Sequence, residues 1–454
     1  MKTSRATTRA SRLTFLLAFT AQFLPLGRAR SEDHVDYKFE YYIEDNNRIK
    51  IQTHGLLFEK ELSANLSLKG EYVYDGISGA TPTGAPPPIG SSQVVTTHME
   101  DVRNAGSLEL AAKLGNHTLT PQISYSTESD YDSLGFAIND AIDFNQKNTT
   151  LLLGISQTLD KIQPKFWTSA KHKDSTDAMV GVTQLLDPRT ILQVNFTLGY
   201  SSGYLADPYK AVRFDGYPDP NSVFPEKRPG ERTKEIIFLS LTHYFDKPNA
   251  SLEASYRFYH DSFDIFSHTV GLAWHQKIGK HLIISPLFRY YDQTAADFYG
   301  VRFPGDPSDP ESTIPIPKYY SADYRLSSMH TFTYGVEAEA IIKEWLHLNA
   351  AYKRYTMHGD DGETPASAYP QAHIFTVGAR IWFRAPTSST NASCNPSARR
   401  RPTAAPSSRF RRWGRSARSR SSHRLRRRRR NSNALYSGGS RSLRRNTPGS
   451  SPRA

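Results

Sequence analysis

Cysteine is almost absent from this chain of 454 residues, and the single one, Cys394, lies in the C-terminal tail. Residues 31–383 therefore contain no disulfide and no cysteine-ligated metal site. The body also lacks a run of 18 apolar residues, which excludes a membrane-spanning helix. Neither absence excludes a membrane protein, because a closed β-barrel satisfies its backbone hydrogen bonds between strands and needs no covalent link.

Acidic residues are missing from both ends of the chain. Residues 1–30 and 384–454 contain no Asp or Glu, and the second segment holds 20 arginines. The formal net charge of +13 thus conceals a body, residues 31–383, whose own net charge is −13. An acidic body argues against nucleic acid as a partner.

The first 30 residues combine scattered basic side chains with an apolar run from Leu13 to Leu26. That run is too short to span a bilayer as a helix and is typical of a secretory signal peptide. We therefore expect export to the outer membrane of a Gram-negative-type bacterium. The domain organisation that we predict is a signal peptide (1–30), a barrel (31–383) and a separate tail (384–454).

The body alternates between apolar and polar residues. In I-F-T-V-G-A-R-I-W-F (374–383), Phe375 and Phe383 share one face with the other apolar residues, while Arg380 belongs to the opposite face. Similar alternation recurs at 66–74, 192–200, 251–258 and 332–340. A soluble β-sandwich shows the same period. Strands of 10 to 14 residues with aromatics near their ends favour the membrane. The pattern predicts an all-β fold: a transmembrane antiparallel β-barrel of about 12–16 strands, with Phe383 as the aromatic of the terminal strand.

Short polar turns and long loops both separate these strands. The short ones include 44–47, 246–249 and 277–280, and the long ones cover about 75–100, 205–232, 300–317 and 358–371. Outer-membrane barrels have short periplasmic turns and longer external loops. We expect the two kinds of connection to separate to opposite ends of the barrel.

Seven charged residues fall on the polar face of predicted strands and are candidates for lining the lumen. They are Lys69, Glu71, Glu253, Arg257, Glu337, Glu339 and Arg380. One interpretation is a constriction that selects solutes by charge, as in a porin-like channel. The other, slightly favoured by the mixed signs, is a set of ion pairs that keeps buried charges neutral. If the lumen is open, the acidic body predicts mild cation selectivity.

Catalysis has no motif to support it, because the H-E-x-x-H, G-x-S-x-G and phosphate-loop patterns are absent. The alternative of a barrel enzyme acting on envelope lipids requires a serine beside a histidine on the lipid-facing surface. His260 and His268, near Ser262 and Ser267, are the best candidates. Acidic loop residues at 306–311 and 360–363 lack calcium-loop spacing and are interpreted as solvated charges. We expect no enzyme activity, no metal and no cofactor.

The tail from 384 to 454 is rich in Arg, Ser and Pro and contains no acid. Such a segment does not bury a core, which predicts disorder. One interpretation of the run Arg426–Arg430 is an arm for nucleic acid or anionic lipid. The favoured one is out-of-frame translation beyond a finished terminal strand.

Four stretches are similar to an uncharacterised family of bacterial outer-membrane β-barrel proteins, filed as a domain of unknown function. They are Y-D-G-I-S-G-A-T-P-T-G (74–84), E-S-D-Y-D-S (128–133), G-Y-L-A-D-P-Y-K (203–210) and S-Y-R-F-Y-H-D-S-F (255–263). The resemblance covers about residues 35–383 and implies an outer-membrane barrel without an established ligand. Its implied partners are outer-membrane lipid, lipopolysaccharide and the barrel-assembly machinery. Within these stretches we interpret Asp75, Gly76, Ser78, Gly79 and Asp207 as parts of constrained loops, which either fold back into the barrel mouth as a plug or form ordinary turns.

Overall fold

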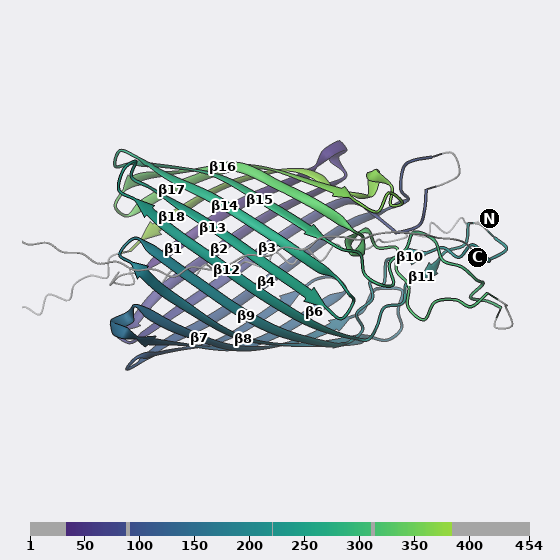
Figure 1. Cartoon of the computed structure of the whole chain (residues 1–454), viewed down its shortest axis with the longest axis horizontal. Coiled ribbons are helices and arrows are strands. Elements are labelled where there is room, and N and C mark those ends of the chain that lie inside the picture. The colour runs from purple at the N-terminus through teal and green to yellow at the C-terminus, as the bar shows by residue number, and fades with distance from the viewer. Residues whose placement is uncertain (1–32, 88–90, 220, 310–313, 384–454) are drawn as a thin grey trace, which may run out of the picture. The chain divides into compact units, whose positions relative to one another are not determined.

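The computed structural model describes residues 33–87, 91–219, 221–309 and 314–383. In these residues sixteen strands form one closed antiparallel barrel (Figure 1). Each strand pairs with its neighbours along the chain, except that β9 pairs directly with β12. The intervening β10 (Ala211–Val212) and β11 (Phe224–Pro225) form a small hairpin of their own. The predicted all-β barrel and its predicted strand number are confirmed.

The barrel strands differ in length but follow one another with few interruptions. Those of the first half are β1 (His34–Glu44), β2 (Ile49–Ser63), β3 (Leu66–Pro82), β4 (Thr96–Leu114), β5 (His117–Thr127), β6 (Tyr131–Phe144), β7 (Thr149–Ile162) and β8 (Lys171–Asp187). Those of the second half are β9 (Thr190–Gly203), β12 (Glu231–Phe245), β13 (Ala250–Asp261), β14 (Phe266–Ile278), β15 (Leu282–Gln293), β16 (Met329–Lys343), β17 (Leu346–Gly359) and β18 (Gln371–Trp382). Four short 3-10 helices complete the elements: η1 (Asp45–Asn47), η2 (Asn145–Lys147), η3 (Tyr324–Leu326) and η4 (Ala366–Ala368).

The barrel closes where β1 meets β18. Their ladder runs from His34 opposite Trp382 to Glu44 opposite Ala372. Asp36 and Arg380 face each other in this ladder, and the Arg380 Nη2 donates to the Asp36 Oδ2 over 2.6 Å. The backbone N–H of Phe383 adds one more bond, of 2.6 Å, to the Asp33 carbonyl. The closing seam therefore has no unpaired edge, as a lipid environment requires.

Large apolar side chains cover the outer face. Tyr334 and Val336 on β16 and Phe375 and Val377 on β18 are 51%, 43%, 47% and 52% exposed. Residues that alternate with them, such as Glu337 next to Val336, point to the inner face because side chains alternate along a strand. This inversion of a soluble protein, apolar outside and polar inside, fits a bilayer as the surrounding solvent.

Connections differ at the two ends of the barrel. The short-turn end holds the start of β1, the end of β18 and seven connections of two to four residues. The long-loop end holds the connections at 83–95, 163–170, 204–230, 294–328 and 360–370. One prediction was wrong: the turn at 45–48 lies at the long-loop end. Since β1 starts at the short-turn end, its first reversal necessarily occurs at the opposite one.

Strands extend further than the alternation predicts. The longest, β4, has 19 residues against an expected 10 to 14. Among the described residues no helix is long and apolar enough to cross a membrane. The predicted signal peptide (1–30) and tail (384–454) fall outside the described residues.

Candidate functional site: the mouth cap and its cavity

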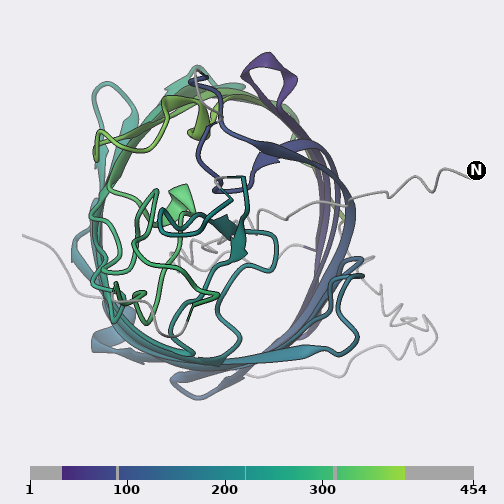
Figure 2. The same cartoon turned by 90° about the vertical axis from the view of Figure 1, so that its right-hand side faces the viewer.

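Two long connections fold over the long-loop end of the barrel. We call their described residues, 204–219, 221–230, 294–309 and 314–328, the mouth cap. Viewed along the barrel axis, the cap lies within the ring of strands (Figure 2), and its hairpin β10–β11 lies beyond their ends (Figure 1). The protein's own chain thus crosses part of the mouth of the barrel.

The mouth cap has a hydrophobic core of its own. Val212, Phe214 and Phe303 are 0%, 1% and 7% exposed, and the rings of Phe214 and Tyr320 meet edge to face at 5.1 Å. Backbone bonds join the two connections, for example between Lys227 and Tyr320 in both directions. Aromatic burial of this kind stabilises a fixed arrangement of the cap.

Buried ion pairs lie under this core. Arg228 contacts Glu226 over 2.8 Å and Asp323 over 2.9 Å, and Arg325 contacts Asp207 over 2.7 Å. Asp323 also accepts from the Nε of Arg325 over 2.9 Å. The carboxylates of Asp323 and Glu226 are 1% exposed, so their charges depend on these partners.

The surroundings shift the pKa values of these carboxyl groups in opposite directions. Burial alone would raise the pKa of Asp323, but Arg325, Lys210 and Arg228 hold it well below its usual range. For Glu226 burial prevails over Arg228, and its pKa is raised. Asp323 is therefore the firmly ionised centre of the cluster.

Lys210 connects the mouth cap to the barrel wall. Its ammonium donates to the backbone carbonyl of Pro82, the last residue of β3, and the residue is only 2% exposed. Close by, Gly84 has φ +89°, and a Cβ there would lie 2.8 Å from the Ala211 carbonyl oxygen. Lysine and glycine together hold the β3–β4 connection against the cap.

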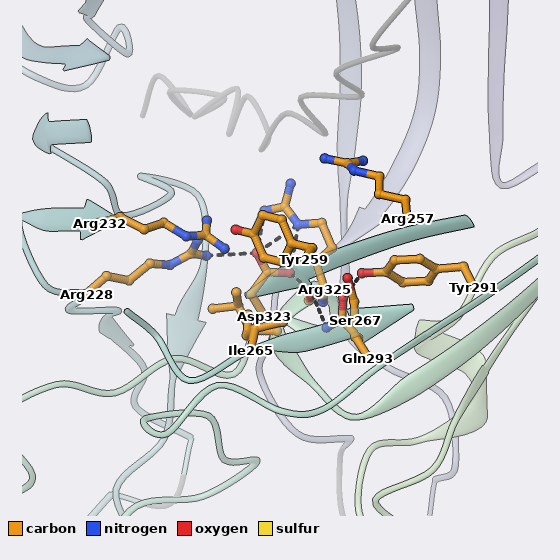
Figure 3. Close-up of a pocket in the computed structure, with 11 residues that line it drawn as sticks. Arg228, Arg232, Arg257, Tyr259, Ile265, Ser267, Tyr291, Gln293, Asp323 and Arg325 are labelled. Atoms are coloured by element: carbon orange, nitrogen blue, oxygen red, sulfur yellow. Dashed lines mark hydrogen bonds and ion pairs between the residues drawn. The ribbon is translucent and has the colours of Figure 1, made fainter. Parts of the chain in front are cut away.

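A cavity of about 310 Å³ lies where the mouth cap meets the wall (Figure 3). Its lining consists of four arginines, one carboxylate, two tyrosines and smaller polar and apolar groups: Arg228, Arg232, Arg257, Arg325, Asp323, Tyr259, Tyr291, Ser267, Gln293, Ile265 and Leu326. Arg228 and Arg325 come from the cap, whereas Arg232 is the second residue of β12 and Arg257 belongs to β13. The cavity is predominantly cationic.

All seven predicted lumen residues lie on the face opposite the exposed apolar side chains. Lys69 and Glu71 alternate with the exposed Tyr72, and Glu253 and Arg257 alternate with Ala254 and Tyr256, which pair with the exposed Leu241 and Leu239. Among the seven, only Arg257 lines the cavity. Their role in selecting solutes stays a prediction.

Several of these charges have partners. The Glu339 Oε1 lies 2.6 Å from the His347 Nδ1, and Glu337 accepts from the Asn349 Nδ2 over 3.3 Å. These contacts lie toward the short-turn end of β16 and β17, away from the mouth cap. Both signs occur on the wall, as ion pairing requires and as a selective constriction also allows.

The predicted loop motif is only partly a loop. Asp75, Gly76, Ser78 and Gly79 lie in β3, which continues to Pro82, so their assignment to a loop was wrong. Asp75 accepts a hydrogen bond from the Thr53 Oγ1 over 2.6 Å and forms an ion pair with Arg103 on β4. This acidic residue, which the sequence assigns to a turn, therefore lies within the sheet. Asp207 does lie in a long connection, as predicted, and pairs with Arg325.

Glycine at position 79 is required by a close approach. The residue has φ +140°, and a Cβ would lie 2.1 Å from the carbonyl oxygen of Arg48 in the β1–β2 connection. The backbone N–H of Ala80 donates to this oxygen over 2.7 Å. The glycine-rich composition of the segment thus reflects packing within the sheet rather than a free loop.

The histidine candidates for a lipid hydrolase do not meet a serine. His268 lies 2.8 Å from the Tyr256 hydroxyl, and His260 stacks on Phe266 at 4.3 Å. Ser267 belongs to the opposite face of β14 and is 3% exposed. Ser262 accepts a bond from the Thr233 backbone. The proposed pairing was wrong, because Ser267 and His268 are adjacent on β14 and face opposite ways, and Ser262 lies beyond the end of β13.

A different serine and histidine do meet on the inner face. The His275 Nδ1 lies 2.9 Å from the Ser285 Oγ, and its Nε2 lies 4.0 Å from Glu253. Sequence reasoning missed this pair, since strand register is needed to place β14 beside β15. As for metals, the described residues contain no group of three His, Cys, Asp or Glu suited to an ion, and Glu311 lies outside them.

Sequence reasoning also missed the buried ion pairs of the mouth cap. Arg228, Asp323 and Arg325 lie in Pro- and Gly-containing connections, where charges are normally solvated. Tyr259 and Tyr291, which also line the cavity, were not identified as candidates from the sequence. The one cavity residue that the sequence identified was Arg257, because it falls on the polar face of its strand.

A closed barrel of sixteen antiparallel strands with an apolar outer face is the fold of outer-membrane β-barrel proteins, and this protein is of that class. It belongs to the family described as "Protein of unknown function (DUF3570)", whose model matches residues 10–171 and 165–371. The predicted family is thereby confirmed, and the fold indicates an outer-membrane location.

Solved structures with similar barrels are remote in sequence, and no curated protein matches the chain. The siderophore receptor PirA from Acinetobacter baumannii is 12% identical, with a TM-score of 0.39 over 73% of this chain and 54% of that one. A bacterial polysaccharide outer membrane secretin is 8% identical, with a TM-score of 0.42 over 78% and 100%. OmpT from Vibrio cholerae is 10% identical, with a TM-score of 0.38 over 78% and 97%. The chain spans about half the length of the PirA receptor.

Proposed function

We propose that the protein is a passive outer-membrane channel for small hydrophilic solutes, narrowed at one end by the mouth cap. The observation that carries the proposal is the closed barrel with a polar inner wall, whose mouth is partly crossed by a cap with its own hydrophobic core. A purely structural barrel requires an apolar outer face but not a cationic cavity beneath a packed cap. Export by a signal peptide, lipopolysaccharide as a neighbour and insertion by the barrel-assembly machinery belong to the same proposal.

Liposome swelling and planar-bilayer recording test this proposal on the full chain. We expect ion current and swelling with sugars up to a sharp size limit, since the mouth cap sets the narrowest passage. A heat-modifiable, strand-rich band on electrophoresis serves as the folding control. Properly folded protein that passes neither ions nor sugars contradicts the channel and leaves a structural envelope protein.

The Ser285–His275 pair favours a second candidate, a hydrolase acting within the barrel. A histidine next to a serine hydroxyl is the geometry that activates a nucleophile, and Glu253 lies on the far side of the imidazole. Against it stands the lack of a recognised nucleophile motif. Hydrolysis of nitrophenyl esters or phospholipid that is lost in Ser285→Ala, but kept in Ser267→Ala, would establish the enzyme. Equal rates in both variants would remove it.

A further inference from the structure

The cavity below the mouth cap receives cationic side chains from two directions. Arg228 and Arg325 reach it from the cap, and Arg232 and Arg257 reach it from the wall (Figure 3). Guanidinium groups offer up to five N–H donors each in a planar arrangement that matches oxyanions. Such a convergence is a feature of sites that hold phosphate or carboxylate groups.

The carboxylates that pair with three of these arginines are buried, and of them Asp323 belongs to the cavity lining. Asp261, the partner of Arg232, and Asp323, the partner of Arg228, have side chains that are 0% and 1% exposed. The side chains of Arg232 and Arg325 are both 27% exposed. An entering solute therefore meets guanidinium edges that are already held in place by ion pairs from behind.

Arg257 is different from the other three. Among the described residues no carboxylate or other hydrogen-bond acceptor contacts it, and its guanidinium lies over the Tyr259 ring at 5.9 Å. In Figure 3 it extends from β13 apart from the arginines of the cap. A half-buried cation without a counterion is costly to keep, and an anion carried by a solute would relieve that cost.

The rest of the lining suits the organic part of a small molecule. Tyr259 and Tyr291 offer ring faces, and Ile265 and Leu326 add aliphatic surface. A volume of about 310 Å³ is at the lower end of what small-molecule sites occupy. A site with this composition fits a compact solute with one strongly charged end.

We propose that this cavity binds a small organic phosphate, with the phosphate on Arg257 and the organic part against Tyr259 and Leu326. The proposal rests on the proposed channel, because the lumen supplies the route by which such a solute reaches the cavity. It names phosphorylated small molecules as the ligands of this cavity, whereas the ion preference of the lumen is set by the acidic wall toward the short-turn end, where Glu337 and Glu339 lie. Phosphate is preferred over carboxylate because its additional oxygen uses more of the available N–H donors.

Calorimetric titration of the full chain in detergent tests the site without requiring transport. Glycerol 3-phosphate is the probe, with inorganic phosphate and glycerol as comparison arms, at low salt. We expect glycerol 3-phosphate to bind more tightly than inorganic phosphate, and glycerol not to bind. Equal binding of glycerol 3-phosphate and inorganic phosphate would contradict a contact between the cavity and the organic part of the ligand. No binding of either phosphate would contradict the proposed site.

Arg257→Gln should weaken glycerol 3-phosphate binding at least tenfold, and Arg257→Lys should restore part of it. The matched control is Arg302→Gln, because Arg302 is an exposed cap arginine that pairs with Asp215 outside the cavity lining. Equal loss in the Arg257→Gln and Arg302→Gln variants would contradict the proposal. Binding of glycerol 3-phosphate without ion current would refute the proposed channel but not the phosphate site. Ion current without binding would refute the phosphate site but not the channel.

Discussion

Lys210 in the mouth cap donates a hydrogen bond to the backbone carbonyl of Pro82, 128 residues away at the end of β3. Burial lowers the pKa of this lysine, and the carboxylates of Asp323 and Asp207 act against that effect. The contact links the end of β3 to the connection 204–230, next to a backbone hydrogen bond of 2.8 Å from the Ala211 N–H to the Thr83 carbonyl. We infer that Lys210 holds the cap closed over the barrel.

Replacing Lys210 by Met should loosen the mouth cap. The change keeps most of the volume but removes a charged hydrogen bond, which contributes about 1.5–3 kcal/mol. Because the cap core is then exposed more often, chymotrypsin should cleave at Phe214, now 1% exposed, roughly tenfold faster or more. Lys165→Met, on an exposed loop residue at the same end, is the control. Unchanged cleavage would show that the desolvation cost of the lysine cancels its hydrogen bond.

Cap opening should depend on pH through Asp323. Its pKa lies below the usual 3.8, so the stability that its ion pairs give is complete above that pH and is lost as the pH falls further. Glu226 acts with the opposite sign, because its raised pKa favours the folded cap once it is protonated. Bilayer recordings should show constant or rarer openings from pH 7 to about pH 5 and more frequent ones below about pH 4.

Asp323→Asn is the comparison for that titration. Removing one partner of a buried ion pair costs about 3–5 kcal/mol, so the variant should open often at neutral pH and show no further rise in acid. If channel openings in Asp323→Asn increase in acid as they do in the parent, a group other than Asp323 causes the pH dependence.

Gly84→Ala should displace the mouth cap, whereas Gly115→Ala should not. Both glycines have positive φ, +89° and +69°, so both variants lose about 1–2 kcal/mol in the backbone. Only at Gly84 would the new Cβ meet carbonyl oxygens, those of Ala211 at 2.8 Å and Ala322 at 3.0 Å. Chymotrypsin cleavage at Phe214 distinguishes them, and equal cleavage would refute the close packing of the β3–β4 connection.

The Glu337→Gln, Glu339→Gln double variant should lower cation preference without unfolding the barrel. The body carries −13, and both carboxylates belong to the inner face with neutral or histidine partners rather than a lysine or arginine at contact distance. Reversal potentials in a salt gradient should therefore show mild cation selectivity in the parent, weaker at high salt because screening acts over about 10 Å at 0.1 M. Anion selectivity in the parent would contradict this prediction.

The barrel was predictable from the sequence because one-sided apolar patterning is local. The spacing of Phe375 and Val377 alone indicates an outward face, and the aromatic Phe383 indicates the last strand. The long connections were located as well, and Asp207 was placed correctly in one of them. The ends of the strands were harder to predict, because Asp75 and Gly79 resemble turn residues. Only the contacts with Arg103 and Arg48 show why these two residues belong to β3.

The cavity was not predictable in the same way, because it depends on contacts between distant segments. Arg325 and Asp207 are 118 residues apart, and Arg228 and Asp323 are 95 apart. Charges in such connections are ordinarily solvated, and a single sequence contains no sign that these become buried. Arg257 was found because strand alternation is a local signal, but its lack of a counterion was not.

The central claim, a channel narrowed by the mouth cap, is tested most directly by single-channel current through the full chain and through a cap-shortened variant. Replacing residues 211–219 by a short Gly-Ser linker removes Val212 and Phe214 and with them the core of the cap. The account predicts a measurable current in the parent and a clearly larger one in the variant, with both proteins heat-modifiable. A folded variant that conducts no better than the parent, or two folded proteins without current, would contradict it.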